Sequence, residues 1–265
     1  MSKKHPIISV VGSSGAGTST VKNTFDQIFR REGITAVSIE GDAFHRFNRV
    51  DMKAELERRY AEGDATFSHF SYEANELGKL EEVFRNYGET GTGETRHYVH
   101  DAREADRFGV DPGNFTNWAP LVPGSDLLFY EGLHGCVAND QVNLSALADL
   151  KIGVVPVINL EWIQKIHRDR ASRGYTTEAV TDVILRRMHA YVHCIVPQFS
   201  ETDINFQRVP VVDTSNPFIA RWIPTPDESL VVIRFKNPRG IDFPYLTQMI
   251  HGSWMSRANS IVIPG

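Results

Sequence analysis

The sequence has few cysteines. It contains two in 265 residues, Cys136 and Cys194, and they do not form a C-x-x-C pair. A disulfide-stapled secreted protein needs more cysteines than this, and a structural zinc site needs them clustered. We therefore expect a chain that folds without covalent or metal cross-links in a reducing compartment, and this predicts a cytoplasmic location.

Long apolar runs and an excess of positive charge are also missing. No stretch approaches the ~20 apolar residues that cross a bilayer, and the run 7–11 is too short for the core of a signal peptide. Lys and Arg total 28 against 33 Asp and Glu, so the formal net charge is −5. A net-acidic chain suits neither a nucleic-acid coat nor a polybasic membrane anchor, so we expect no nucleic acid and no membrane among its partners.

The chain does contain short apolar runs that alternate with helical patterns. This alternation of strands and helices predicts an α/β fold with a largely parallel sheet and ligands at the carboxyl ends of its strands. We expect a single domain over 1–265, with a loop-rich insertion at 88–124 near the ligand. The runs predict strands at 7–11, 35–39, 127–130, 152–158, 208–212 and 230–235, and helices at 18–31, 160–172 and 177–195.

A glycine-rich turn follows the first predicted strand and opens the first predicted helix. It matches the phosphate-binding template G-x-x-x-x-G-K-[ST], in which backbone N–H groups and the helix N-terminus hold an anion. Ser19 stands at the hydroxyl position that ligates Mg²⁺, but Thr18 stands where the template has Lys, so another cation must replace that charge. A tight turn without a ligand is the alternative, and a dinucleotide site with Glu40 as its ribose-binding acid fits the glycine spacing less well. The turn reads Gly12-Ser13-Ser14-Gly15-Ala16-Gly17-Thr18-Ser19-Thr20.

Acidic residues end two further predicted strands. Asp42, with Glu40 as the second candidate, follows the second strand, where a carboxylate can take a proton from an attacking hydroxyl. The alternative is that Asp42 caps the next helix. Glu131 follows four apolar residues, the Walker B arrangement whose carboxylate holds Mg²⁺, and a surface acid is the less favoured alternative.

Basic residues gather in two segments. His45, Arg49 and Lys53 are spaced i, i+4, i+8, which predicts one helical face that could hold a substrate phosphate. The alternative is an ordinary solvated face in which Lys53 pairs with Glu57. We treat His100 and His134 as ordinary loop histidines.

The second basic segment spans 164–176 and contains Lys165, Arg168, Arg170 and Arg173. Such a cluster can bind transferring phosphoryl oxygens, and Gly174 would serve as the hinge of a lid. Lys165 is the candidate replacement for the lysine missing at position 18. An exposed charged helix is the alternative, and Arg186 and Arg187 could be interface or surface charges.

Together, these segments resemble the bacterial type of phosphoribulokinase, from residue 5 to the end of the chain. The resemblance implies a P-loop kinase sandwich with a mostly parallel mixed sheet flanked by helices. It also implies transfer of the γ-phosphoryl group of ATP to O1 of D-ribulose 5-phosphate, which gives ribulose 1,5-bisphosphate in the Calvin cycle. The segments that carry it are 11–20, 40–47 (Glu-Gly-Asp-Ala-Phe-His-Arg-Phe), 129–135 (Phe-Tyr-Glu-Gly-Leu-His-Gly) and 166–175 (Ile-His-Arg-Asp-Arg-Ala-Ser-Arg-Gly-Tyr).

The resemblance also implies roles for residues at matching positions. Asp42 is similar to the catalytic base, and Ser19, Glu131 and Asp42 to the groups around Mg²⁺. The family's Thr in the lysine position makes Thr18 expected. The family further implies NADH as an allosteric activator and a homo-oligomer, an octamer. The remaining implied residues are Lys165, Arg168 and Arg173 for phosphoryl transfer, His45, Arg49, Lys53 and Tyr98 for the sugar phosphate, and Arg31, Arg234 and Arg257 for the effector.

Two other functions stay open on the residues alone. A uridine kinase-like or pantothenate kinase-like enzyme would share the architecture but usually keeps the lysine, and the basic face suits a phosphorylated acceptor better. A nucleotide sensor that binds ATP without transferring phosphate would explain Thr18, but it leaves Asp42, Glu131 and the basic segment without a purpose.

Overall fold

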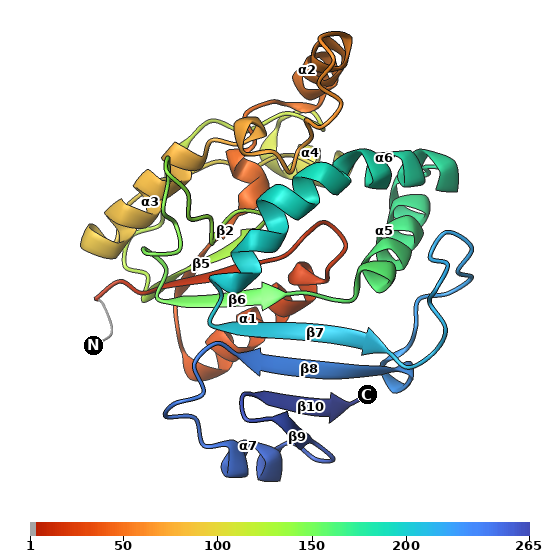
Figure 1. Ribbon diagram of the computed structural model, residues 1–265. Coiled ribbons are helices and arrows are strands. Elements are labelled where there is room, and N and C mark those ends of the chain that lie inside the picture. Colours follow the sequence, from red (N-terminus) through yellow and green to blue (C-terminus); the bar gives the residue numbers. More distant parts are fainter. Residues whose placement is uncertain (1–3) are drawn as a thin grey trace.

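The structure is a computed structural model that describes residues 4–265, apart from the side chains of Ser172 and Arg173 (Figure 1). An eight-stranded sheet in the order β2-β5-β1-β6-β7-β8-β10-β9 runs through the molecule. The strands of this sheet are β1 (Ile7–Val11), β2 (Ala36–Glu40), β5 (Leu127–Gly132), β6 (Leu150–Val154), β7 (Ile204–Pro210), β8 (Ser229–Phe235), β9 (Trp254–Arg257) and β10 (Ser260–Pro264). The helices are α1 (Thr18–Glu32), α2 (Arg49–Ala61), α3 (Leu77–Thr90), α4 (Ala102–Phe108), α5 (Ile158–Arg173), α6 (Thr177–Ala190) and α7 (Phe243–Met249).

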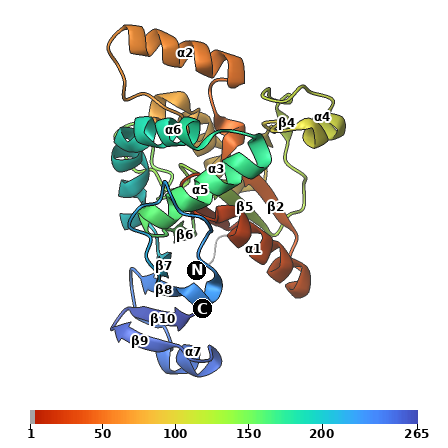
Figure 2. The ribbon, with the colours of Figure 1, turned by 90° about the vertical axis from the view of Figure 1, so that its right-hand side faces the viewer.

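The sheet is mixed. β2, β5, β1, β6 and β7 run parallel to one another, and β8, β10 and β9 extend the sheet in antiparallel pairs. Figures 1 and 2 show α2 standing out at one end of the molecule and β9, β10 and α7 at the opposite end. The α/β class and the mostly parallel mixed sheet expected from the sequence are confirmed.

Helices cover both faces of the parallel half because the side chains of β5 alternate between two cores. Phe129 packs against Phe25 and Phe29 of α1 on one face. Leu128 and Tyr130 point to the other face, where α3 contributes Leu80, Phe84 and Tyr87. Each of these large side chains, once buried, contributes roughly 1.5–3 kcal/mol. The strand ends are thereby held in fixed register.

The predicted strand 152–158 is placed too far along the chain. β6 covers Leu150–Val154, and α5 begins at Ile158. Pro156 lacks the backbone N–H that a central strand needs, so the strand stops before it. The predicted helix 177–195 changes character within its range, because α6 ends at Ala190 and a π-helical turn, Tyr191–Ile195, continues it.

The segment 88–124 contains more regular structure than we expected. It holds the end of α3, the short helix α4 and a two-stranded pair of β3 (Glu94–Thr95) with β4 (Ala119–Pro120). Arg96 attaches it to the body of the protein, donating from Nε to the Ala43 carbonyl at 2.8 Å and from Nη2 to the His45 carbonyl at 2.7 Å. None of the helices between residues 4 and 265 has the length and apolar character needed to cross a membrane.

Candidate active site

The candidate site lies at the carboxyl ends of the parallel strands. The glycine-rich turn, residues 12–18 and hereafter the phosphate loop, follows β1, and Asp42 follows β2. Strand register places Glu40 beside Glu131, and Val11 beside Gly132, at the same edge of the sheet. α5 follows β6 and reaches back over this edge. The structure thus brings the phosphate loop, Asp42 and Glu131 to one edge of the sheet.

Backbone conformation makes the phosphate loop a cradle. Gly15 and Gly17 have φ of 110° and 100°, which side chains other than glycine rarely adopt. A Cβ on Gly12 would lie 2.7 Å from Thr18 Cγ2 and 2.9 Å from the Val154 carbonyl oxygen. Gly17 precedes α1, and among the described residues no side chain caps that helix, so its first N–H groups face the loop. This is the geometry in which a helix N-terminus binds phosphate.

The two hydroxyl residues after the loop differ in environment. Thr18 is 9% exposed, with its side chain near enough to Glu131 to lower the pKa of that carboxyl, whereas Ser19 is exposed in the first turn of α1. Burial raises the pKa of Glu131, the Thr18 side chain opposes this, and the negative charges of Asp42 and Glu40 raise it further. A site with this excess of carboxylates favours a cation, which fits Mg²⁺. Among the described residues no three His, Cys, Asp or Glu form a closed metal cage, and Mg²⁺ in kinases needs only one or two protein carboxylates beside water and phosphate.

Asp42 lies among histidines. His45 Nε2 lies 3.1 Å from Asp42 Oδ1, and His100 Nε2 lies 3.5 Å from Asp42 Oδ2. Burial acts to raise the pKa of Asp42, but His45, His100 and His69 outweigh it and hold that pKa below its ordinary value. The carboxylate is therefore ionised at neutral pH and, with its side chain 40% exposed, remains accessible to a substrate. His100 is thus no ordinary loop histidine, contrary to our expectation.

The prediction that His45, Arg49 and Lys53 share one helical face is wrong. Asn48 caps α2 by accepting a hydrogen bond from the Asp51 N–H at 2.8 Å, so the helix begins at Arg49 and His45 lies outside it in extended backbone. His45 is instead oriented by Asn75, whose Oδ1 lies 2.8 Å from its Nδ1. Burial lowers the pKa of His45, but Asp42 and Asn75 outweigh it and the net shift is upward.

The three basic residues consequently lie in different environments. Arg49 donates from Nη2 to the His100 carbonyl at 3.0 Å, which brings it close to the histidine cluster. The Lys53 side chain is 80% exposed, and its Nζ lies 3.9 Å from Glu57, the ordinary pair weighed as the alternative. Tyr98 contacts both histidines, with its ring centroid 6.2 Å from that of His45 and 4.9 Å from that of His100.

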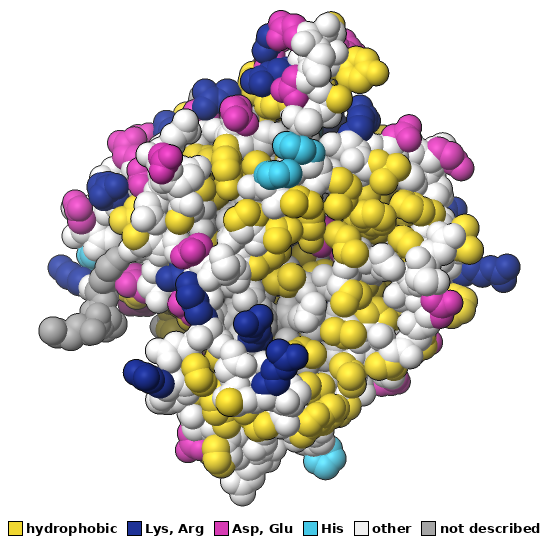
Figure 3. All heavy atoms as spheres, in the orientation of Figure 1, with side chains coloured by type: hydrophobic (Ala, Val, Ile, Leu, Met, Phe, Trp, Pro, Cys, Tyr) yellow, Lys and Arg dark blue, Asp and Glu magenta, His cyan; other side chains and the backbone are white. Residues whose placement is uncertain are grey.

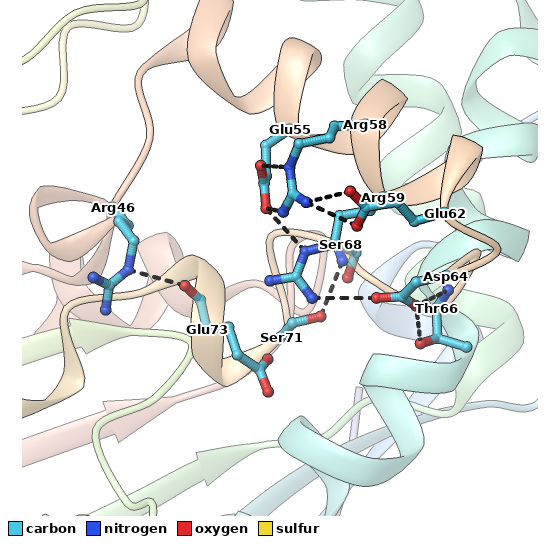
Figure 4. A network of polar contacts seen from close by, with 10 residues as sticks. All are labelled: Arg46, Glu55, Arg58, Arg59, Glu62, Asp64, Thr66, Ser68, Ser71 and Glu73. Atoms are coloured by element: carbon cyan, nitrogen blue, oxygen red, sulfur yellow. Dashed lines mark hydrogen bonds and ion pairs between the residues drawn. The ribbon is translucent and has the colours of Figure 1, made fainter.

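A polar network joins α2 to the loop that follows it (Figure 4). Arg59 donates from Nε to Glu55 Oε1 at 2.9 Å and from Nη1 to Asp64 Oδ2 at 3.3 Å, which joins the helix to the loop that follows it. The Arg59 guanidinium also lies 4.4 Å from the ring centroid of Phe67. Arg46, which precedes α2 in the chain, donates from Nε to the Glu73 carbonyl at 3.0 Å.

The cations of α5 meet the phosphate loop. Arg168 Nη2 donates to Ser14 Oγ at 3.0 Å, and Lys165 is 6% exposed with its Cβ 3.1 Å from where a Cβ on Gly15 would lie. Burial lowers the pKa of Lys165 to about 8, with Arg187 adding to the effect and Asp169 opposing it. The side chain of Arg173 lies outside the described part of the structure. The structure thus places Lys165 and Arg168 beside the loop that lacks a lysine.

Several residues of the site were not predicted from the sequence. Asp169 is 3% exposed and binds Lys165 Nζ at 2.6 Å and Arg168 Nη2 at 2.9 Å. Its position four residues after Lys165 on a helix was the available signal. Arg187 is half-buried, and its Nη2 lies 3.3 Å from His69 Nδ1, so it is not a surface charge. No local pattern marks His69.

The three predicted effector arginines do not meet within one copy of the chain. Arg234 of β8 and Arg257 of β9 both lie opposite Ser260 in the intervening strand β10. Arg31 lies near the end of α1, which packs on β1 and β5, and its exposed guanidinium pairs with Glu32 at 2.8 Å.

Comparisons with known proteins agree with this geometry. Residues 7–215 match the model of the phosphoribulokinase/uridine kinase family. The whole chain is 86% identical to phosphoribulokinase 2 of Cereibacter sphaeroides and 69% identical to phosphoribulokinase of Nitrobacter vulgaris, and it covers 91% of each. A solved structure of phosphoribulokinase from Rhodobacter spheroides superposes with a TM-score of 0.89 at 81% identity, over 99% of this chain and 91% of that one. The resemblance stated from the motifs is confirmed.

Proposed function

Because the chain belongs to the phosphoribulokinase/uridine kinase family, we propose that it transfers the γ-phosphoryl group of ATP to O1 of D-ribulose 5-phosphate, a step of the Calvin cycle. One observation carries the proposal. Lys165 and Arg168 of α5 lie against the phosphate loop, at the same strand edge as Asp42. A sensor that only binds nucleotide has no need of a carboxylate and two cations arranged in this way.

Asp42 acts as the general base in this proposal. Its side chain is ionised and partly exposed, so it can accept the proton of the O1 hydroxyl as that oxygen attacks. The Asp42 carboxylate is positioned by His45, which is itself held by Asn75. The cap role weighed for Asp42 finds no support, because Asp42 lies inside the short 3₁₀ helix Gly41–Phe44 and Asn48 caps α2, the helix that follows.

The nucleotide lies in the phosphate loop, residues Gly12 to Thr18, with Ser19 and Thr20 in the first turn of α1. Glu131, Ser19 and Asp42 are the residues that would hold Mg²⁺, and the ion would offset the negative charge of the phosphates. Lys165 and Arg168, with Arg173 as a further member, offset charge on the transferring group in place of the absent loop lysine. The predicted lid 164–176, with its hinge at Gly174, stays part of this proposal as a movement of the C-terminal end of α5, since Lys165 is already buried beside the loop.

The sugar phosphate lies between Asp42 and α2. His45 and Arg49 supply positive charge, and Tyr98 packs beside both histidines of the cluster. Lys53 remains part of this proposal as a residue at the outer edge of the sugar-phosphate site. It can contact the substrate only if its ion pair with Glu57 breaks. A phosphorylated acceptor suits this set better than a neutral nucleoside.

We extend the proposal to an oligomer with NADH as activator in the cytoplasm. Arg31 could join Arg234 and Arg257 only across an interface between copies, because α1 and β9 are on distant parts of the sheet. Hydrophobic side chains gather over α6 and the strands below it (Figure 3). Leu185 of α6, Val192 of the π-helical turn and Val196, the next residue after that turn, are exposed. Exposed apolar surface of this kind is typical of an interface.

The experiment that tests the function is an acceptor panel with ATP and Mg²⁺. We expect ADP release to depend on ribulose 5-phosphate, and uridine and pantothenate to give none. ADP release with a nucleoside instead would contradict the assigned substrate. ATP binding without release for any acceptor would support the sensor.

A further inference from the structure

One face of α5 rests on the tip of the phosphate loop. Three of its side chains, spaced three and four residues apart, reach three successive loop residues. Gln164 donates from Nε2 to the Gly15 carbonyl at 2.5 Å, in addition to the Arg168 contact described above. The third contact is a short hydrogen bond that Ser13 Oγ donates to Glu161 Oε1.

The Ser13–Glu161 contact is the buried member of the three. Ser13 is 2% exposed and Glu161 is 5% exposed, whereas the hydrogen bond of Arg168 lies at the surface. Tyr191 supports the carboxylate from the π-helical turn, donating to Oε2 at 3.4 Å. A buried polar pair of this kind is costly to break, because neither partner finds water in exchange.

Lys165 lies one helical turn beyond Glu161 on the same face. A Cβ on Gly15 would lie 3.1 Å from both the Glu161 carbonyl oxygen and Lys165 Cβ, so helix and loop are in direct contact over this turn. The position of Glu161 on Ser13 therefore determines where Lys165 lies along the loop.

We propose that Glu161 is a positioning residue for phosphoryl transfer, which anchors α5 to Ser13 of the phosphate loop and so sets where Lys165 meets the terminal phosphate. This deepens the proposed function and rests on it. Glu161 touches neither nucleotide nor acceptor in this scheme. It acts through Ser13 and through the helix that it shares with Lys165.

The anchor has a proton-dependent strength. Burial raises the pKa of Glu161 to about 7, against hydrogen bonds from Ser13 and Tyr191 and the charge of Lys165. Arg187 of α6 lines the same small cavity. The ionised carboxylate accepts strong hydrogen bonds from both hydroxyls, and the neutral acid accepts weaker ones. The anchor is therefore strongest above neutral pH and weakens as the pH falls below it.

The test compares variants of the whole enzyme by ATP binding and by turnover. Because a misplacement of about 1 Å can cost about 10²-fold in rate, we expect Glu161→Ala to lower kcat at least tenfold, with the Kd for ATP changed by less than about threefold. Ser13→Ala should do the same, and the double variant should add little. Glu161→Gln keeps an acceptor for Ser13 and should restore most of kcat, but without the inflection near pH 7. Glu178→Ala, at an exposed position on α6, is the matched control and should leave both constants unchanged.

Hydrogen exchange gives a readout that does not depend on the acceptor. Glu161→Ala and Ser13→Ala should speed amide exchange in residues 12–18, and Glu161→Gln should not. If both variants keep the kcat, pH profile and loop exchange of the unaltered chain, the positioning role is overturned. If the unaltered chain fails to phosphorylate ribulose 5-phosphate while loop exchange responds as expected, the proposed function fails and the anchor stands. Should Glu161→Ala not fold, Ser13→Ala and Glu161→Gln decide the question.

Discussion

Asp42 shows how a single residue acquires its properties from neighbours both near and far in sequence. The carboxylate follows β2, but the histidines beside it come from three separate segments, at positions 45, 69 and 100. Burial alone would favour the neutral acid, and these neighbours reverse the balance so that Asp42 stays ionised. A base that is ionised before substrate arrives can accept a proton without first losing one.

Replacing this carboxylate by its amide is the direct test of the base. General-base catalysis is worth about 10²–10⁴-fold, so Asp42→Asn should lower kcat by at least that range while ATP binding survives. The measurement is steady-state ADP release together with equilibrium binding of ATP. Asp227→Asn is the matched control, because Asp227 is exposed in the short 3₁₀ helix Pro226–Glu228 and belongs to no part of the proposed site, so it should affect kcat little. Near-normal turnover in Asp42→Asn would remove Asp42 from the base role.

Residues that follow a strand or a glycine pattern were predictable, and those brought in by loops were not. Asp42, Glu131 and Lys165 each stand in a recognisable local pattern. His100 lies 3.5 Å from Asp42 although 58 residues separate them in sequence, and nothing within that loop indicates the contact. His45 was assigned to a helix because i, i+4 spacing says nothing of where Asn48 starts α2. The i, i+4 spacing indicates which residues could share a helix face, but the capping residue determines where the helix begins.

At the scale of elements, the fit of α5 on the phosphate loop depends on the absence of a side chain at Gly15. Its φ of 110° is unfavourable for other residues, and the space beyond its Cα is taken by the backbone of α5. Gly33 also has a positive φ, of 68°, but nothing lies within 4 Å of its Cβ position. The two glycines thus separate backbone strain from the helix contact.

We expect Gly15→Ala to push α5 off the loop and Gly33→Ala only to strain the chain. Gly15→Ala should lower kcat/KM for ATP at least tenfold, because a small displacement of the reacting groups slows the reaction strongly. Gly33→Ala should cost about 1–2 kcal/mol in unfolding free energy and leave the kinetics unchanged. Steady-state kinetics and urea unfolding of both variants make the comparison. Equal kinetic effects of the two substitutions would show that α5 does not need close contact with Gly15.

The alternation of elements was predictable, and several element boundaries were not. Short apolar runs identified β1, β2 and β5 within a residue or two. β1 and β5 are mostly buried, and β2 is an edge strand that is only partly buried. α3 was not predicted although Leu77, Leu80, Phe84 and Tyr87 form one apolar stripe, since Gly78 and Gly88 weaken its helical character. The antiparallel half depends on pairing between distant segments, such as β7 with β8, which periodicity alone does not report.

On the scale of the whole molecule, buried titratable groups make stability depend on pH in opposite directions. Glu161 binds its proton more tightly in the folded protein, because burial raises its pKa from 4.5 to about 7. The contribution of Glu161 to the free energy of unfolding therefore falls as the pH rises through that range. His134 is 2% exposed, and its Nε2 has no hydrogen-bond partner among the described residues. Burial, aided by the charge of His45, lowers the pKa of His134 from 6.5 to about 3.

His134 should therefore make the protein less stable in mild acid. As the pH falls below 6.5 the unfolded chain gains a proton at this imidazole and the folded chain does not, so unfolding is favoured. Between pH 7.5 and pH 5.5 this linkage amounts to about 1.4 kcal/mol for one histidine with these pKa values. We expect His134→Gln, measured by urea unfolding at both pH values, to lose less stability over the interval than the unaltered chain by about that amount. An imidazole NMR titration needs no substitution, and a His134 pKa near 6.5 in the folded protein would refute the linkage and with it the burial that explains it.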